Sequence, residues 1–257
     1  MTPISAMVIT RNEARHISAC LETLHFCDEI VVVDSQSEDN TVLLAKGFTD
    51  KVYTKPFENF SAQKNFAISK TNHDWILSVD ADERVSTELA KEIKDVLEYK
   101  NSAFSVPRIN YLFGRKMRYG ANHHDHPIRL FHKKYAEFEG IIHEQLKVKG
   151  KVGALTQPLL HYSTPSINEY MRKLNQYTDL EAERLYQLGK KVSYWDVSFR
   201  PLSRFFQRYV LQWGVLDGMP GFFFSTLSAF YDFVKYVKLW ELHEVKTKSS
   251  ADFRNTS

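Results

Sequence analysis

Three carboxylates close together at the end of an apolar run are the residues of this chain best able to do chemistry. The run is Trp75–Val79, and Asp80, Asp82 and Glu83 follow it directly. Like charges this close disfavour ionisation unless a cation or a strong hydrogen-bond network compensates them. A small number of hard oxygen ligands suits Mg²⁺ or Mn²⁺, which keep several waters and also take phosphate oxygens from a substrate. The spacing therefore favours a divalent cation bound by Asp80 and Asp82, with a diphosphate as its other partner.

Other interpretations of the same segment need different neighbours. The acids could simply favour the N-terminus of a following helix and pair with Arg84. An EF-hand loop starting at Asp80 would need an oxygen ligand at its fifth position and Gly at its sixth, but Arg84 and Val85 stand there, so that interpretation fails. A phosphohydrolase with Asp80 as its nucleophile also places Asp-x-Asp after a strand. That alternative stays open, although such enzymes usually carry Thr or Val where this chain has Arg84.

Strands and helices alternate through roughly the first hundred residues. Apolar runs predict strands at Ile4–Ile9, Ile30–Val33, Lys51–Thr54 and Trp75–Val79, and helical spacing lies between them. The second run is continuously apolar, as strands covered on both faces are. Ser86 is expected to cap the helix after the fourth strand. This alternation predicts a right-handed, mostly parallel α/β sheet flanked by helices.

Polar residues follow three of these strands, at the edge where ligands of such sheets bind. They are Thr10, Asn12 and Glu13 after the first strand, Asp34 after the second, and Asp80 with Asp82 after the fourth. Taken alone, each of the first four has an ordinary explanation as a helix cap or a turn residue. Their convergence on one edge is what indicates a binding site.

A basic, histidine-rich segment comes after the predicted sheet strands. Between Phe104 and Lys151 there are ten Lys or Arg and four Asp or Glu, a local balance of +6, together with five of the ten His. Such a segment suits an anionic ligand. Asp125 in HHDHP and Glu144 in IIHEQL lie within it, and each could act as a base or form a structural ion pair with Arg129 or a neighbouring Lys.

The composition limits the class of protein. The 257 residues fit one large domain, or one domain with a smaller appendage, and a net charge of +3 is too small for a general nucleic-acid binder. Cys20 and Cys27 have no metal-ligand company and do not form a disulfide framework. The N-terminus lacks a signal-peptide pattern, and no stretch reaches the about 18 uninterrupted apolar residues of a spanning helix. We therefore expect a cytoplasmic protein without a nucleic-acid partner.

Four motifs in order give the chain a family resemblance. They are AMVITRNEARHISACLETL, EIVVVDSQSEDNT, AQKNFAI and WILSVDADERV, and together they resemble the inverting family 2 nucleotide-sugar glycosyltransferases of GT-A (Rossmann-like) fold. Through PIRLFHKK, EGIIHEQL and the aromatic tail, the chain is similar to the lipopolysaccharide-core glucosyltransferase-like branch. The resemblance implies a metal-dependent enzyme that uses Mg²⁺ or Mn²⁺ and a donor such as a UDP-sugar, and that glycosylates a saccharide or lipid-linked acceptor in cell-envelope synthesis.

The same resemblance implies roles for individual residues. Thr10, Asn12 and Glu13 would border the nucleotide, Asp34 would receive the base or ribose, and Lys64 would stand near the diphosphate. Asp80 would contact ribose or metal, and Asp82 would bind the metal that bridges the diphosphate. Inversion needs a carboxylate to accept the acceptor's hydroxyl proton, and we favour Glu144 over Asp125 for this. His143 is a further candidate metal ligand, and Arg129 could hold an anionic donor or acceptor. The family's usual Asp-Asp-Gly-Ser turn is replaced by Asp34-Ser-Gln-Ser, so the nucleotide base stays open.

The C-terminal third differs in character from the rest. A helix is expected from Ser166 to Lys190, and aromatic and basic residues follow from Arg200 to Trp240. We expect a catalytic domain over 1–160, a helical, aromatic-rich extension over 161–245 and a flexible tail over 246–257. The extension suits peripheral contact with the cytoplasmic face of the inner membrane. Packing on the domain or on a second copy, as a homo-oligomer, is the alternative. The remaining alternative for the function is a non-catalytic module that binds a nucleotide or a saccharide.

Overall fold

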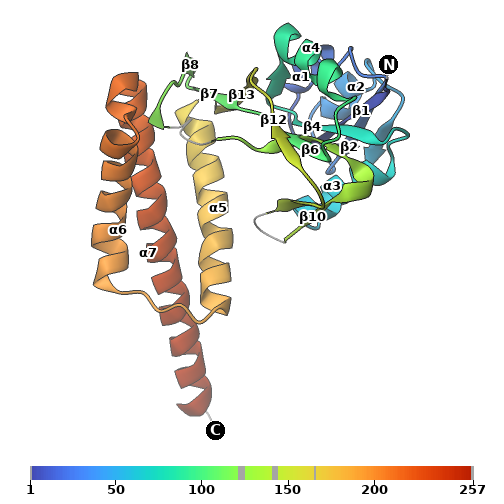
Figure 1. Cartoon of the computed structure of the whole chain (residues 1–257). Coiled ribbons are helices and arrows are strands. Elements are labelled where there is room, and N and C mark those ends of the chain that lie inside the picture. The colour runs from blue at the N-terminus through green and yellow to red at the C-terminus, as the bar shows by residue number, and fades with distance from the viewer. Residues whose placement is uncertain (1, 121–124, 141–143, 165, 256–257) are drawn as a thin grey trace. The chain divides into compact units, whose positions relative to one another are not determined.

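The computed structural model describes residues 2–120, 125–140, 144–164 and 166–255 (Figure 1). The chain forms two compact units. The first contains residues 1–109 and 124–163, and the second contains residues 110–123 and 164–257. The sequence predicted a boundary near residue 160, whereas residues 110–123 group with the helical second unit.

A seven-stranded sheet forms the centre of the first unit, in the order β12-β6-β9-β4-β1-β2-β3. The strands β1, β2, β3 and β4 are parallel neighbours, and β9 is antiparallel to both β4 and β6. The predicted mostly parallel sheet is therefore confirmed, and the antiparallel β9 is an insertion the sequence did not indicate. The bounds are β1 Ile4–Thr10, β2 Glu29–Asp34, β3 Val52–Thr54, β4 Trp75–Asp80, β6 Ala103–Ser105, β9 Ile128–His132 and β12 Val152–Ala154.

Helices cover both faces of this sheet. They are α1 Ile17–Glu22, α2 Thr41–Ala45, α3 Phe60–Ser69 and α4 Thr87–Val96. Side chains alternate across β1, so Ala6 and Val8 pack with α1, α2 and α4, while Met7 packs with α3 on the other face. Burial on both faces explains why the central strands are mostly apolar and why Ile30–Val33 of β2 is a continuous apolar run. The predicted N-cap is confirmed, because the Ser86 hydroxyl accepts the N–H of Leu89 at 3.1 Å.

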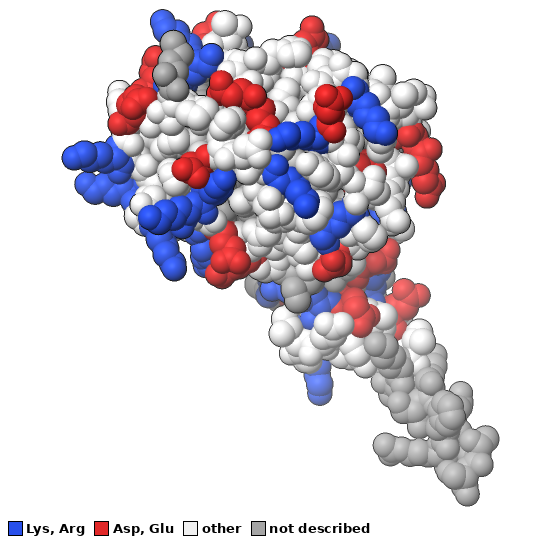
Figure 2. Space-filling view, turned by 90° about the vertical axis from the view of Figure 1, so that its right-hand side faces the viewer, with Lys and Arg blue, Asp and Glu red and all other residues white. Residues whose placement is uncertain are grey.

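Short strands complete the first unit. They are β5 Glu83–Val85, β10 Ala136–Glu139, β11 Gln145–Val148 and β13 Leu159–Thr164, with a 3-10 turn η2 at Lys133–Tyr135. Antiparallel pairing joins β10 to β11 and β13 to β5. Lys and Arg are interspersed with Asp and Glu on the face shown in Figure 2, so no field of one sign covers it.

The second unit consists of helices and a hairpin. Its elements are α5 Ile167–Gln187, α6 Tyr194–Phe206, a π-helical turn η3 Gln207–Leu211, a 3-10 turn η4 Gly214–Asp217 and α7 Met219–Asn255. The strand β7, Arg108–Leu112, begins in the first unit and ends in a hairpin with β8, Arg115–Lys116. The helix α7 includes most of the segment predicted as a flexible tail. Within the described residues, no helix is both long and apolar enough to cross a membrane.

Candidate functional site

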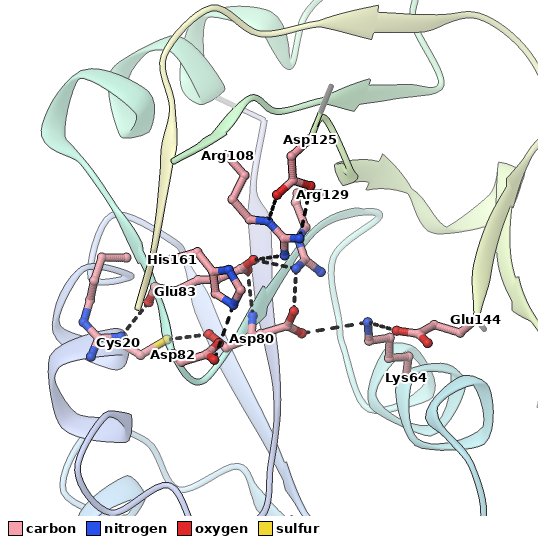
Figure 3. Close-up of polar contacts among 11 residues, drawn as sticks. Cys20, Lys64, Asp80, Asp82, Glu83, Arg108, Asp125, Arg129, Glu144 and His161 are labelled. Carbon is pink, nitrogen blue, oxygen red and sulfur yellow. Dashed lines mark hydrogen bonds and ion pairs between the residues drawn. The ribbon is translucent and has the colours of Figure 1, made fainter. Parts of the chain in front are cut away.

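The acidic segment forms a tight turn between β4 and β5, at the carboxyl end of the parallel strands (Figure 3). Glu83 closes the turn, because its Oε2 accepts the backbone N–H of Asp80 at 3.0 Å. Arg84 supports it from the other side by donating to the carbonyl oxygens of Ala81 at 3.1 Å and His16 at 3.0 Å. Glu83 and Arg84, which follow the two aspartates in the sequence, therefore hold the turn on which both aspartates lie.

Two cations from different elements meet the Asp80 carboxylate. Arg129 on β9 donates to its Oδ2 at 2.5 Å, and Lys64 on α3 lies 3.8 Å from its Oδ1. Burial alone would raise the pKa of the Asp80 carboxyl, but the charges of Arg129 and Lys64 outweigh that effect and hold the pKa below its usual value. Asp80 is therefore an anion whose charge is largely compensated by the protein itself.

Glu83, to which the sequence assigned no role, is the centre of a buried ion-pair network. Its side chain is fully buried, and its Oε1 accepts from Arg129 at 2.6 Å and from Arg108 at 3.2 Å. Burial raises the pKa of this carboxyl although both guanidinium groups oppose the rise. Arg108 also binds both oxygens of Asp125, at 2.8 and 3.1 Å. The structure thus ties Asp125, a predicted candidate base, into a bidentate ion pair with Arg108.

Arg129 was expected to hold an anionic donor or acceptor. Its terminal nitrogen instead bonds both Asp80 and Glu83, and these two carboxylates raise the pKa of the guanidinium despite the opposing effect of burial. The Nε of Arg129 is buried and has no hydrogen-bond partner among the described residues. In this structure Arg129 holds Asp80 and Glu83 close together through these two bonds.

Asp82, the predicted metal ligand, lies against a histidine that the sequence did not single out. His161 on β13 places its Nε2 3.4 Å from Oδ2 of Asp82. Pairing of β13 with β5 creates this contact, with His161 opposite Glu83 and the N–H of Tyr162 donating to the Asp82 carbonyl at 2.8 Å. A histidine inside the short apolar strand LLHYST carries no local signal of this role.

A divalent cation fits the Asp82–His161 pair. Ligand atoms about 2.1 Å from one ion lie roughly 3–3.5 Å apart at adjacent coordination positions, which matches the 3.4 Å separation. No group of three or more acidic, His or Cys ligands occurs within the described ranges. Mg²⁺ and Mn²⁺ sites that keep waters and substrate phosphates need only one or two protein ligands. The predicted ligand His143 lies outside the described residues.

Glu144, the favoured candidate base, is connected to the same acids through Lys64. The Nζ of Lys64 lies 3.0 Å from Oε1 of Glu144 and 5.1 Å from the centre of the Phe138 ring. Lys64 is buried, so its charge acts at short range on both Asp80 and Glu144. The structure therefore brings together three residues that are far apart in the sequence.

The ends of β1 and β2 form the neighbouring part of the edge. Thr10 pairs with Asp34 in the sheet register, and Asp34 accepts the N–H and hydroxyl of Ser37 at 2.8 and 2.5 Å. Asn12 adopts a positive φ of 54° and exchanges bonds with the loop after β2, accepting the N–H of Glu38 at 2.8 Å. The backbone N–H of Glu13 donates to the Thr41 hydroxyl at 2.8 Å. Asn12 and Glu13 thus join the two loops that border Thr10 and Asp34.

Two buried polar atoms at this edge have no partner among the described residues. They are Oγ1 of Thr10 and Oε1 of Gln63. Gln63 is fully buried on α3, and its Nε2 donates to the Ser35 hydroxyl at 2.6 Å. Buried polar atoms in native proteins are nearly always hydrogen-bonded. These two are therefore suited to meet polar atoms of a ligand, and Gln63 is a candidate that sequence reasoning missed.

Comparison with known proteins gives a coherent result. Residues 5–156 match the family model described as glycosyl transferase family 2. A Rickettsia felis protein described as an uncharacterized glycosyltransferase is 33% identical and aligns over 94% of this chain and 90% of its own length. The lipopolysaccharide core biosynthesis glycosyltransferase LpsC of Rhizobium meliloti is 28% identical over 97% of this chain and 96% of its own.

A solved structure has a similar fold. The mannosyltransferase PcManGT from Pyrobaculum calidifontis, in complex with GDP-Man and Mn²⁺, aligns with a TM-score of 0.53 at 13% identity, over 93% of this chain and 87% of its own. At this identity the similarity shows the fold alone. The GT-A-type arrangement expected from the sequence is therefore confirmed.

Proposed function

The chain belongs to glycosyl transferase family 2, and from that premise we propose that it performs metal-dependent, inverting transfer of a sugar from a nucleotide-sugar donor. The observation that carries this proposal is the meeting of Asp82 with His161 beside an Asp80 that is already neutralised by Arg129 and Lys64. Asp82 would thereby bind a divalent cation, Mg²⁺ or Mn²⁺, and Asp80 would accept hydrogen bonds.

The donor nucleotide, for example that of a UDP-sugar, would bind along the ends of β1 and β2. Asp34 would accept from the base or ribose, and the unpartnered Oγ1 of Thr10 supports a polar ligand beside it. Asn12 and Glu13 would shape the border of this pocket, because their contacts with the loop after β2 hold it in place. Lys64 would face the diphosphate, and Asp80 the ribose.

A cation bound by Asp82 and His161 would act as a Lewis acid that stabilises the charge developing on the leaving diphosphate. The protein's own contribution is to keep these two ligands in place. The bonds of Glu83 and Arg84 hold the turn on which Asp82 lies, and the β5–β13 pairing holds His161. The ligands are therefore positioned before the donor arrives, so little reorganisation is needed during the reaction.

Inversion requires a base that removes the proton of the attacking acceptor hydroxyl. We assign this role to Glu144, whose carboxylate lies 3.0 Å from Lys64 on the side of the acidic turn. As the acceptor oxygen bonds to the anomeric carbon and the bond from that carbon to the diphosphate breaks, the acceptor hydroxyl would transfer its proton to Glu144. Lys64 would keep the carboxylate oriented. Asp125, the other candidate, has both oxygens bound by Arg108, which supports a structural role.

We further propose that the acceptor is a saccharide or lipid-linked glycan of the cell envelope, such as lipopolysaccharide core, and that the protein works as a peripheral protein on the cytoplasmic face of the inner membrane. The name of the Rhizobium meliloti relative supports the first part. Exposed Trp195, Phe199, Leu202 and Phe206 at helical spacing along α6 support the second.

Phosphohydrolysis with Asp80 as nucleophile has less support. A nucleophilic carboxylate must reach a phosphorus atom, yet one oxygen of Asp80 accepts from Arg129 at 2.5 Å and the other faces Lys64. The chain's family and its named relatives are glycosyltransferases, so the same relationship also disfavours a purely non-catalytic binding module.

Metal-dependent nucleotide binding tests the proposal. A ligand at about 100 times its Kd stabilises a protein by about 2.7 kcal/mol, which is roughly 5–10 °C in Tm for a chain of this size. We expect UDP or another nucleoside diphosphate with Mn²⁺ to give such a shift in the wild type, and Asp82→Asn to lose the Mn²⁺-dependent part and sugar transfer. Asp95→Asn, an exposed change on α4, is the matched control. Full transfer by Asp82→Asn would refute the metal assignment.

A further inference from the structure

A cationic cavity lies in the second unit, away from every residue assigned above. It measures about 540 Å³, a volume typical of small-ligand sites. One wall is the β7–β8 hairpin, and the other is the junction of η4 with α7; Figure 1 shows β8 near the end of the helices where α7 begins. The lining residues are Arg115, Lys116, Arg118, Asp217, Gly218, Met219 and Pro220.

Among the described residues, no anionic group pairs with the three cations of this cavity. The side chains of Arg115, Lys116 and Arg118 are exposed, and no described residue forms an ion pair or side-chain hydrogen bond with them. The single carboxylate, Asp217, is used otherwise, since its oxygens accept the backbone N–H groups of Arg118 at 2.8 Å and Tyr119 at 3.0 Å. Three positive charges against one negative charge leave a site that favours an anion.

The start of α7 adds to this preference. This helix begins at Met219, and Gly218 precedes it with a positive φ of 65°. The N-terminus of a helix carries a partial positive charge from its unpaired N–H groups. Pro220 in the first turn has no N–H to satisfy, as is common at this position. The helix end and the three cations therefore face the same cavity.

Exposed apolar residues adjoin the cavity along the chain. Trp213, Leu216 and Met219, called the apolar rim below, are 60%, 58% and 62% exposed; Met219 lines the cavity, and Leu216 directly precedes its lining residue Asp217. The exposed apolar residues of α6 end at Phe206, and from there the chain runs through η3 into η4, which forms one wall of the cavity. Apolar surface that borders a basic site is unusual for a protein surrounded only by water, and it is suited to the boundary between head groups and acyl chains.

We propose that this cavity binds the phosphate head group of an anionic membrane lipid while the apolar rim enters the leaflet. The proposal deepens the peripheral membrane location in the proposed function and rests on it. A freely soluble phosphate compound would use the cations but would leave Trp213, Leu216 and Met219 without a partner, so the rim selects the lipid. The first unit's acidic turn shares no residue with this site.

Vesicle co-sedimentation of the full chain tests the proposal. Vesicles of phosphatidylcholine mixed with phosphatidylglycerol should bind the wild type, and phosphatidylcholine alone should bind it much less. Because each Lys or Arg near an anionic surface strengthens binding several-fold, Arg115→Gln/Lys116→Gln/Arg118→Gln should bind the anionic vesicles about a hundredfold more weakly. The control Lys91→Gln/Lys100→Gln/Lys149→Gln removes the same charge from exposed positions of the first unit and should bind nearly as the wild type does.

Three further measurements distinguish lipid binding from the binding of a soluble phosphate compound, and the lipid site from the nucleotide site. Leu216→Ser/Met219→Ser should weaken binding to anionic vesicles while all three cations remain. Glycerophosphate should compete only weakly; full competition, or equal vesicle binding by the two triple variants, would overturn the proposal. Mn²⁺-dependent nucleotide binding should be unchanged in the Arg115/Lys116/Arg118 variant. If the wild type showed no Mn²⁺-dependent nucleotide binding, that result would count against the proposed function. The vesicle experiment would still test the lipid site, because the two measurements use different residues.

Discussion

Glu83→Gln tests whether Glu83 is a structural acid, distinct from the metal ligand that we propose at Asp82 in the same turn. Glu83 is fully buried, accepts the N–H of Asp80 through Oε2, and accepts from Arg108 and Arg129 through Oε1. Glutamine has the same shape but only one acceptor oxygen. If that oxygen faces the two arginines, the amide NH₂ meets the Asp80 N–H, donor against donor.

The magnitude follows from these three bonds. A buried donor left without an acceptor costs about 1–3 kcal/mol, and a hydrogen bond to a charged group is worth about 1 kcal/mol more than a neutral one. Two such bonds are weakened, and the removal of one buried charge offsets part of the loss. We expect the free energy of unfolding to fall by about 3 kcal/mol, or roughly 6–12 °C in Tm for a chain of this size.

Thermal unfolding in EDTA measures this effect without any contribution from metal. Glu88→Gln is the matched control, because Glu88 is exposed in the first turn of α4 and its loss should cost less than about 1 kcal/mol. Asp82→Asn should also change Tm little in EDTA while it removes metal-dependent nucleotide binding. A Glu83→Gln protein with unchanged Tm but weakened Mn²⁺ binding would refute our reasoning and make Glu83 a metal ligand.

The remaining predictions concern single groups of the site. His161→Gln should weaken the Mn²⁺ dependence of UDP binding about as Asp82→Asn does, and unchanged Mn²⁺ titrations would exclude it as a ligand. Glu144→Gln should lower kcat for sugar transfer by about 10²–10⁴-fold with nucleotide binding retained, and a rise in KM alone would contradict its role as a base. Burial raises the pKa of Asp80, but Arg129 and Lys64 hold it below its usual value, so the unfolded chain binds more protons in acid. This stabilisation is present above about pH 4 and lost as the pH falls; Asp80→Asn should therefore flatten the acid side of a plot of Tm against pH, and an unchanged slope would contradict the ion pairs.

Local patterns carried enough information for the sheet and its helices. The strands β1, β2 and β4 are buried on both faces, so their residues are mostly apolar, with Ser5 and Ser78 as buried exceptions, and their carboxyl ends are visible where polar residues begin. Ser86 was recognisable as a cap because an N-cap bond involves residues three apart. The segment of β9 was expected among strands and loops of a mixed region, but PIRLFHKK gives no indication that its partners are β4 and β6.

The site was harder to predict because its contacts depend on the fold. The position of Asp80 and Asp82 after a strand was evident, but the contact of His161 with Asp82 arises from strand pairing, which no short motif encodes. For Asp125 the sequence offered Arg129 or a neighbouring Lys as the ion-pair partner and gave no indication of Arg108. In the structure Arg108 pairs with Asp125, and Arg129 pairs with Asp80.

The acids of the turn and their neighbours form one network of ion pairs. Ion pairs among the described residues join four carboxylates to three cations: Asp80, Glu83, Asp125 and Glu144 to Lys64, Arg108 and Arg129. Each of these four carboxylates therefore has a cationic partner that the protein supplies. Asp82 lies outside these six ion pairs and against His161, at 3.4 Å. This arrangement supports our proposal that a divalent cation binds at Asp82, because the charge of the neighbouring Asp80 is already compensated by Arg129 and Lys64.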